Sequence, residues 1–160
     1  MISLIYLRIP LIVGLVGVGT LFAQNAKIKK MLDQASLKYT VDGDGDFKLT
    51  FGVGNGRSQL LYIMSAMEEM GGQSIVEIWS PAYKQKEISD RILVRLLSDS
   101  HRRKIGAWEV TSSGEYVYAV YKAKVPLSSL NPEFLRAVCE GIVSTADEIE
   151  KDIMNGSDDF

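Results

Sequence analysis

The spacing of apolar residues along this chain of 160 residues predicts a helix first and a series of strands after it. In residues 26–36 the apolar positions recur at intervals of three and four with lysines between them, which predicts a short amphipathic helix. Its apolar face consists of Ile28, Met31, Leu32 and Ala35. Residues 37–41 are typical of a brief strand, and the Asp-Gly-Asp-Gly stretch at 42–45 is typical of a hairpin turn.

The clearest strand covers residues 47–53, where large apolar residues alternate with lysine, threonine and glycine. A period of two places the large side chains on one face of a half-buried strand. Residues 60–64 are apolar on both faces, which predicts a central strand. Residues 67–73 interrupt the pattern, and residues 74–80 resume it until Pro81, which we expect to end that strand. Such short links predict an antiparallel meander.

The period becomes helical again at residue 89 and predicts a helix over residues 89–103 that Ser89 caps. Its buried stripe is expected to comprise Ile92, Leu93, Leu96 and Leu97. Residues 105–125 then contain two strand-like runs joined by a Thr-Ser-Ser-Gly turn, which predicts a hairpin. In its second strand the residues expected to face the helices are Val117, Ala119, Tyr121, Ala123 and Val125.

The last helix has the most complete start signal, with Asn131 as its cap and Pro132 in the first helical position. A long apolar stripe follows, made of Leu135, Val138, Ile142, Ala146, Ile149 and Ile153. Together these elements predict one α+β domain over residues 27–154, in the order helix, strands, helix, hairpin, helix. We expect an antiparallel sheet of five to six strands with helices packed on it, and a frayed tail at residues 155–160.

Residues 1–23 have the features of a secretory signal peptide: one early charge, Arg8, an apolar centre, and a small residue, Ala23, before Gln24. The sequence therefore predicts export and a periplasmic or secreted protein. An uncleaved membrane anchor facing the periplasm is the alternative, since the apolar stretch approaches the length that spans a bilayer.

Charge and composition exclude several classes of function. With 18 basic and 20 acidic residues the net charge is −2, which gives no global field to attract nucleic acid. Cys139 is the single cysteine, so the chain cannot form an internal disulfide, and one histidine beside it excludes a Cys/His zinc cluster. No cofactor, metal site or catalytic residue is predicted.

The remaining chemical motifs are incomplete. The acidic run of residues 42–46 begins like a calcium loop but lacks the later glycine and glutamate. Residues 52–58 are rich in glycine, yet no lysine follows them and a strand, not a helix, is expected next. His101 has serines and Asp99 nearby, but neighbours on one helix point apart. Paired carboxylates such as Glu68 and Glu69 stay open as an acid–base alternative.

Two groups of residues are candidates for partner binding. Trp79, Tyr116 and Tyr118 belong to the residue types that anchor protein interfaces, and both tyrosines are expected on the hairpin face opposite the helices. Arg91 and Arg95 lie one helical turn apart and share a face. With the basic residues that follow, Arg102, Arg103 and Lys104, they form a stripe suited to an acidic partner or an anionic lipid.

The middle of the chain carries a family resemblance. A leucine-bearing helix runs through Ser98-Asp99-Ser100-His101, a tryptophan and an aromatic-rich hairpin follow, and the next helix opens with Asn131-Pro132-Glu133. This order resembles the YbjN-type family of proposed bacterial sensory transduction regulators, which share the fold of type III secretion chaperones. The resemblance covers residues 27–153. The family often has an asparagine where this chain has Asp99 and Ser100.

The resemblance implies no catalytic residues, and family members are mostly soluble and cytoplasmic, from which the exported leader departs. We therefore expect a non-enzymatic, chaperone-like interaction module of the bacterial cell envelope. Its partner is expected to be another protein or a second copy of the chain as a homodimer. It is not expected to be nucleic acid, and a membrane is expected only if the leader is uncleaved. The alternative function is a small-molecule or lipid-binding envelope protein with a pocket between the sheet and the last helix.

Overall fold

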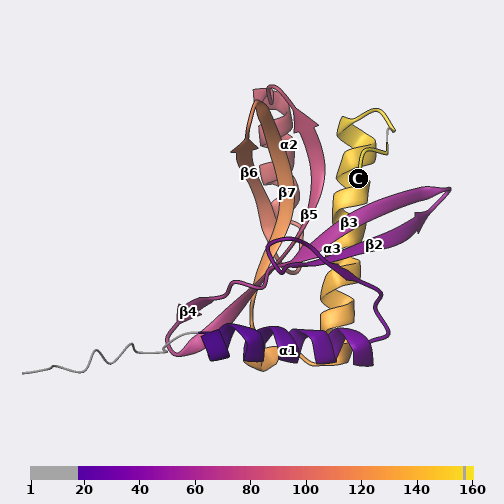
Figure 1. Ribbon diagram of the computed structural model, residues 1–160. Coiled ribbons are helices and arrows are strands. Elements are labelled where there is room, and N and C mark those ends of the chain that lie inside the picture. The colour runs from indigo at the N-terminus through magenta and orange to yellow at the C-terminus, as the bar shows by residue number, and fades with distance from the viewer. Residues whose placement is uncertain (1–17, 157) are drawn as a thin grey trace, which may run out of the picture.

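The structure, a computed structural model, describes residues 18–156 and 158–160, with side chains from residue 26 onward (Figure 1). Its helices are α1 (Val18–Gln34), α2 (Asp90–Ser100), the short 3-10 helix η1 (Leu127–Ser129) and α3 (Pro132–Ile153). Its strands are β1 (Thr40–Val41), β2 (Phe47–Gly54), β3 (Arg57–Ile63), β4 (Glu68–Met70), β5 (Gln73–Gln85), β6 (Ala107–Ser113) and β7 (Tyr116–Pro126). The predicted α+β class and the predicted order of elements are confirmed.

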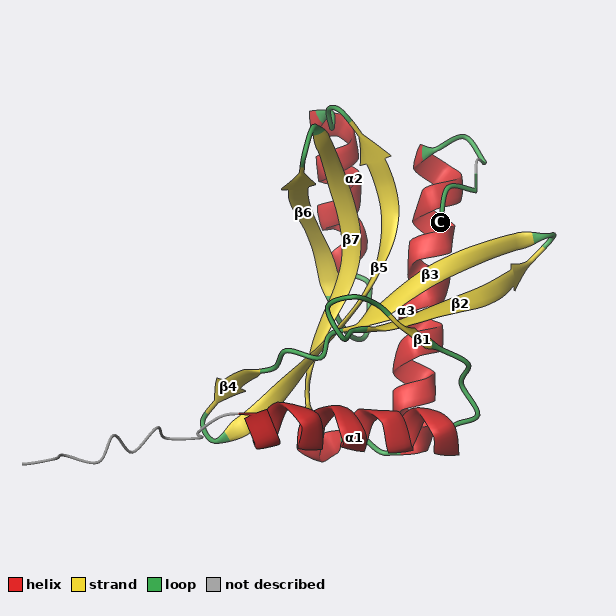
Figure 2. Ribbon diagram, in the orientation of Figure 1, coloured by secondary structure: helices red, strands yellow, loops and turns green. Residues whose placement is uncertain are grey.

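The strands form one antiparallel sheet in the order β1-β2-β3-β5-β7-β6, and β4 pairs with β5 beside this path. In Figure 2 the helices α2 and α3 lie behind the strands, and α1 crosses one end of α3. The sheet residues that face these helices are almost fully buried, among them Leu61, Ile63, Ile78, Ala123 and Val125.

The helix α3 closes the core as its sequence predicts. Asn131 accepts a hydrogen bond from the backbone N–H of Phe134 at 2.8 Å, so the helix begins where its cap indicates. The stripe from Leu135 to Ile149 is buried to within 2% of complete burial at each predicted position. Burying one such aliphatic side chain contributes about 1.5–3 kcal/mol, which makes this stripe the main attachment of α3 to the sheet.

Pro81 does not end its strand, so that prediction was wrong. β5 continues to Gln85, and its pairing with β7 shifts register between Pro81 and Tyr83. A bulge is one of the few places where a sheet tolerates proline, because the ladder needs no N–H there. Beside the bulge, β3 and β5 share only the pairs Tyr62↔Trp79 and Ile63↔Ile78, and the β2–β3 hairpin diverges from the rest of the sheet (Figure 1).

Residues 67–73, expected to interrupt the strands, instead contain β4 and its turn, which brings the sheet to seven strands. Gly71 and Gly72 both have positive φ angles, 58° and 75°, as two-residue hairpin turns require. The glycine pair was the sequence signal for this hairpin. β4 itself is exposed and contains the two glutamates at 68 and 69, so it lacked the apolar alternation of the other strands.

The helix α2 differs from its prediction in length and in its buried face. It ends at Ser100, not at residue 103, and Leu97 is 68% exposed, although the helical period had placed it in the core. Only Leu96 and Asp99 are buried. α2 packs on β6, the last strand of the sheet, so one side of the helix has no strand beneath it.

The predicted leader lies mostly outside the described residues. α1 begins at Val18, so the expected cleavage point after Ala23 falls within this helix. Among the described residues, no helix combines the length and the apolar composition needed to cross a membrane. At the other end, the tail expected to fray touches the body of the protein, since Asp159 N–H donates to Glu150 at 2.8 Å.

Candidate functional site

The sheet face opposite the helices carries a group of half-buried aromatic residues, which we call the helix-free face. Strand register places on it Tyr62 of β3, Trp79 and Lys84 of β5, and Tyr116 and Tyr118 of β7. The sequence-predicted residues Trp79, Tyr116 and Tyr118 therefore share one face.

Contacts divide the aromatic residues of this face into two groups. The rings of Tyr62 and Trp79 stack with centroids 4.5 Å apart, and Trp79 Nε1 donates to the sulfur of Met64 at 3.1 Å. Farther along β5, the ammonium of Lys84 lies 5.0 Å from the ring of Tyr116 and 5.8 Å from that of Tyr118. These contacts hold the rings of both groups in place, and the rings remain partly exposed to solvent.

A cavity of about 250 Å³ opens on the helix-free face beside the first aromatic group. It is lined by Met64, Ala66, Met67, Glu68, Ile75, Glu77 and Lys124. Methionine side chains adapt their shape to an incoming apolar group, so the cavity is suited to receive a side chain of a partner. Its rim is charged, because Lys124 pairs with Glu68 at 3.2 Å.

Next to this cavity, Lys122 lies between two carboxylates. Its ammonium is 2.8 Å from Glu77 and 2.9 Å from Glu109. Burial disfavours the ammonium, but the hydrogen bonds to Glu77 and Glu109 outweigh that cost and raise the pKa of Lys122. The charges in the middle of the helix-free face are thus paired with one another. The apolar surface of this face comes from the two aromatic groups.

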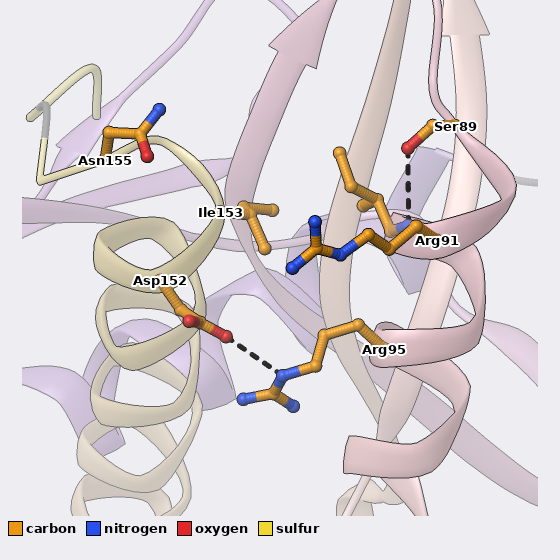
Figure 3. Close-up of a pocket in the computed structure, with 7 residues that line it drawn as sticks. Ser89, Arg91, Arg95, Asp152, Ile153 and Asn155 are labelled. Atoms are coloured by element: carbon orange, nitrogen blue, oxygen red, sulfur yellow. Dashed lines mark hydrogen bonds and ion pairs between the residues drawn. The ribbon is translucent and has the colours of Figure 1, made fainter.

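A second candidate surface is the groove between α2 and α3, which contains all five residues of the predicted basic stripe. Arg91 and Arg95 extend from α2 toward α3, and Arg95 Nε donates to Asp152 at 2.9 Å (Figure 3). They line a cavity of about 320 Å³ with Ser89, Ile92, Asp152, Ile153 and Asn155. The prediction that Arg91 and Arg95 share a face is confirmed.

The lower part of this groove is a cavity of about 370 Å³ between the loop after α2 and the middle of α3. Its lining residues are Arg102, Arg103, Lys104, Ile105, Tyr121, Ala137, Gly141, Ser144 and Thr145. The loop after α2 is attached to β7, because the hydroxyl of Tyr121 donates a hydrogen bond to the Ile105 carbonyl. The basic side chains are therefore held on an ordered backbone.

Asp99 joins the two parts of the groove. It is fully buried, and its carboxylate accepts hydrogen bonds from Arg103 at 2.7 and 2.8 Å, Arg102 at 2.9 Å and Trp108 Nε1 at 2.9 Å. Arg95 lies 3.5 Å away. Burial alone would raise the pKa of Asp99, but these donors outweigh it and lower the pKa to about 2. Asp99 is thus ionised at every physiological pH.

Sequence reasoning noticed Asp99 only as a neighbour of His101. The histidine is exposed and forms the C-cap of α2, with its backbone N–H bonded to the Asp99 carbonyl. The usable signal was the spacing of Asp99 to Arg102 and Arg103, three and four residues away, as in helical ion pairs. Burial of the aspartate depends on Trp108 of β6, which no local pattern reveals.

A second buried charge cluster, also missed from the sequence, joins the β2–β3 hairpin to the end of α3. Arg57 Nε donates to Asp147 at 2.8 Å, and Arg57 Nη2 donates to Glu150 at 2.8 Å. The same guanidinium bonds the Gly156 carbonyl at 3.1 Å and lies 3.5 Å from Asp158. This cluster attaches the tail to the hairpin and buries most of the arginine side chain.

The other motifs have structural roles. Asp42 accepts hydrogen bonds from the backbone N–H groups of Asp44 and Asp46, so the acidic run forms a turn. Residues 52–58 make the tip of the β2–β3 hairpin. Cys139 is fully buried, and burial raises the pKa of its thiol to about 12. Within the described residues no group of three or more His, Cys, Asp or Glu side chains is arranged to hold a metal ion.

The space between the sheet and α3, where the alternative function needs a pocket, is filled along the stripe of α3 by buried side chains. A cavity of about 240 Å³ lies at its margin, between β2 and α3. It is lined by Phe51, Gly52, Val53, Glu140, Val143, Ser144 and Asp147.

No protein-family model and no curated protein matches the sequence. Among solved structures, the chain is similar to an uncharacterised protein from Methanothermobacter thermautotrophicus, with a TM-score of 0.52, 10% identity, and 82% of this chain and 97% of that chain covered. It is also similar to YbjN from E. coli, described as a "putative transcription regulator", with a TM-score of 0.47, 9% identity, and 82% and 92% covered. The YbjN-type protein named from the sequence is therefore among its structural neighbours, and the likeness concerns the fold alone.

Proposed function

We propose that this protein is a non-enzymatic interaction module that holds a segment of a partner polypeptide on its helix-free face. The observation that carries the proposal is the stack of Tyr62 on Trp79 beside the methionine-lined cavity. Rigid aromatic side chains next to an apolar recess are typical of the centre of a protein interface. The helices α2 and α3 lie on the other face of the sheet (Figure 2), and the aromatic side chains of the helix-free face are partly exposed.

A pull-down from the cell envelope fraction tests this function. The bait is the wild-type protein, and the test variant carries Tyr116→Ala and Tyr118→Ala, which remove two half-exposed rings of the helix-free face. Phe134→Ala is the matched control, because Phe134 is 40% exposed but lies on α3. The expected result is a partner that the wild type and the Phe134 variant recover and the tyrosine variant loses. Equal recovery by all three would exclude Tyr116 and Tyr118 from the interface and contradict a partner that covers the whole helix-free face.

Self-association is part of the proposal and is supported by a different region. β6 is an edge strand, and the neighbouring helix α2 exposes Val94 by 63% and Leu97 by 68%. Val110 of β6 is 45% exposed. An unprotected edge beside exposed apolar residues favours pairing with a second copy. Light scattering should then show a dimer for the wild type and a monomer for Leu97→Glu, whereas a monomeric wild type would exclude this interface.

The location of this function is proposed to be the bacterial cell envelope, because residues 1–23 have the features of a signal peptide. The buried side chains described in α1, including Ile28 and Leu32, all follow the expected cut, so cleavage would keep this part of the core. Mass spectrometry of the protein from fractionated cells should find Gln24 as the first residue. An intact leader in the membrane fraction would indicate the anchor, and an intact leader in the cytoplasm would contradict export.

A further inference from the structure

The groove between α2 and α3 holds more positive charge than the protein itself neutralises. Its five basic side chains are Arg91, Arg95, Arg102, Arg103 and Lys104. Three carboxylates pair with them, from Asp99, Glu148 and Asp152. Among the described residues, Arg91 and Lys104 have no hydrogen-bond or ion-pair partner. Two cations are therefore in excess in a concave site.

Asp99 makes this cluster of arginines possible. Guanidinium groups repel one another, and one buried carboxylate that contacts Arg95, Arg102 and Arg103 offsets that repulsion from beneath. With its carboxylate at the bottom, the groove presents the exposed side chains of Arg91, Arg102 and Lys104 to another anion. Arg102 is 60% exposed and Arg95 33% exposed, so both can be reached from solvent.

The length of the groove sets the size of its ligand. From Arg91 to Ser100 the helix α2 rises by roughly 14 Å, and Arg102, Arg103 and Lys104 follow in the loop beyond its end. A single phosphate or carboxylate would meet only one end of this series. An extended polypeptide segment needs about four residues to span the helical part at 3.3 Å per residue, and more to reach the loop.

We infer that the groove binds an acidic, extended segment of a partner polypeptide, with apolar side chains between its carboxylates. Ile92 and Ile153 are half-buried in the wall of the upper cavity, and Ile105 is half-buried in the lower one. They offer contacts for the apolar side chains, while arginine binds carboxylates through paired hydrogen bonds. The site is distinct from the helix-free face, and the inference stands independently of the function proposed for that face.

An anionic membrane fits the groove less well than a polypeptide. Arg91 and Arg95 extend across the gap toward α3 (Figure 3). Asp152 stands on the opposite wall beside Arg95, where a lipid surface would bring further negative charge against it. A chain that threads between the helices can place its carboxylates on the arginines and keep them away from Asp152.

Fluorescence anisotropy with a labelled peptide of alternating glutamate and valine tests the inference on the full chain. Arg91→Glu should weaken binding by about tenfold or more, since it reverses the charge of a side chain whose described surroundings hold no partner. Lys84→Glu is the matched control, because it makes the same charge change on the helix-free face. Its affinity should stay within about twofold of the wild type.

Two further ligands test whether the groove requires carboxylates and whether it prefers a polypeptide to a membrane. The same peptide with glutamine in place of glutamate should not bind, and vesicles of phosphatidylglycerol should not compete with the acidic peptide. Arg91→Gln serves as a second variant in case Arg91→Glu alters the melting temperature. Absence of peptide binding, equal losses from Arg91→Glu and Lys84→Glu, or vesicle binding that depends on Arg91 would each overturn the inference.

Discussion

The two buried charge clusters have opposite compositions. In one, a single carboxylate, Asp99, contacts three guanidinium groups, those of Arg95, Arg102 and Arg103. In the other, a single guanidinium, Arg57, contacts three carboxylates, those of Asp147, Glu150 and Asp158. Lys151 adds a second cation by pairing with Asp147, yet carboxylates still outnumber cations there.

The most buried carboxyl of each cluster, Asp99 in one and Glu150 in the other, differs in the direction of its pKa shift. Burial raises the pKa of both carboxyls, but Arg103, Trp108 and Arg102 lower that of Asp99 to about 2. Burial dominates at Glu150, where one arginine and the Asp159 N–H do not compensate, and its pKa is raised. The Asp99 cluster therefore keeps a constant charge and presents cations to a groove, whereas the Arg57 cluster is a closed contact that responds to acid.

The largest expected effect comes from removing the carboxylate that organises the first cluster. Asp99→Ala leaves the arginines without their shared anion and Trp108 Nε1 without its acceptor. The expected loss in the free energy of unfolding is about 3–5 kcal/mol, as for other broken buried ion pairs. Urea denaturation measures it. Asp33→Ala, which breaks an exposed pair with Lys29, should cost less than about 1 kcal/mol. Equal losses for Asp99→Ala and Asp33→Ala would show that the buried ion pairs of Asp99 stabilise the fold no more than an exposed pair does.

Removing the cation of the second cluster should cost less. Arg57→Met leaves Glu150 buried without its arginine, but that carboxyl can take up a proton and become neutral. We expect a loss of about 2–3 kcal/mol at pH 7 that shrinks as the pH falls, together with faster proteolysis of the tail near Gly156. A loss that grows on acidification would contradict this account of the cluster.

Both clusters illustrate what the sequence could not predict. Arg57 and Asp147 are 90 positions apart, so no periodicity or local spacing relates them. Asp99 has local arginine partners, yet its burial depends on a strand that begins eight residues later. The prediction for Leu97 was wrong for a related reason: α2 packs on the edge strand β6, and the side of the helix that contains Leu97 is exposed.

Local signals, by contrast, predicted much of the fold. Asn131 and Pro132 marked the start of α3 because capping acts within one turn. The alternation in residues 47–53 identified β2, and the same logic placed Tyr116 and Tyr118 together on one face of the sheet. The basic stripe was visible as a run of residues. Its position in a groove facing α3 was not, because that depends on how two distant helices lie on one sheet.

Acid titration separates the two clusters directly. The folded-state pKa of Asp99, about 2, is below the ordinary aspartate value of 3.8, so its contribution is complete above pH 3.8 and lost as the pH falls toward 2. That contribution is worth roughly 2 kcal/mol. In the Arg57 cluster, Glu150 acts in the opposite sense, because its raised pKa favours the folded state below 4.5, whereas the lowered pKa of Asp147 acts in the same sense as that of Asp99. Urea midpoints from pH 5 to pH 2 should fall less steeply for Asp99→Asn than for the wild type; parallel curves would contradict this.

The smallest effect on stability is expected at the wall of the groove that faces the arginines. Asp152 and Glu148 are each more than half exposed and pair with Arg95 and Arg103, so Asp152→Asn with Glu148→Gln should cost less than about 1 kcal/mol. The two carboxylates compete with an acidic peptide for the same guanidinium groups. Their neutralisation should therefore tighten binding of the glutamate–valine peptide by several-fold in anisotropy measurements, since every removed competitor frees donors.

The Arg57 cluster supplies the matched control for this last experiment. Asp158→Asn removes a partly exposed carboxylate that contacts Arg57, an arginine outside the groove. It changes the net charge in the same direction and should leave the affinity for the peptide unchanged beyond a small general effect. If Asp158→Asn tightened binding as much as either groove substitution, total charge and not the groove would determine affinity. The contrast between an open cationic cluster and a closed one would then not extend to binding.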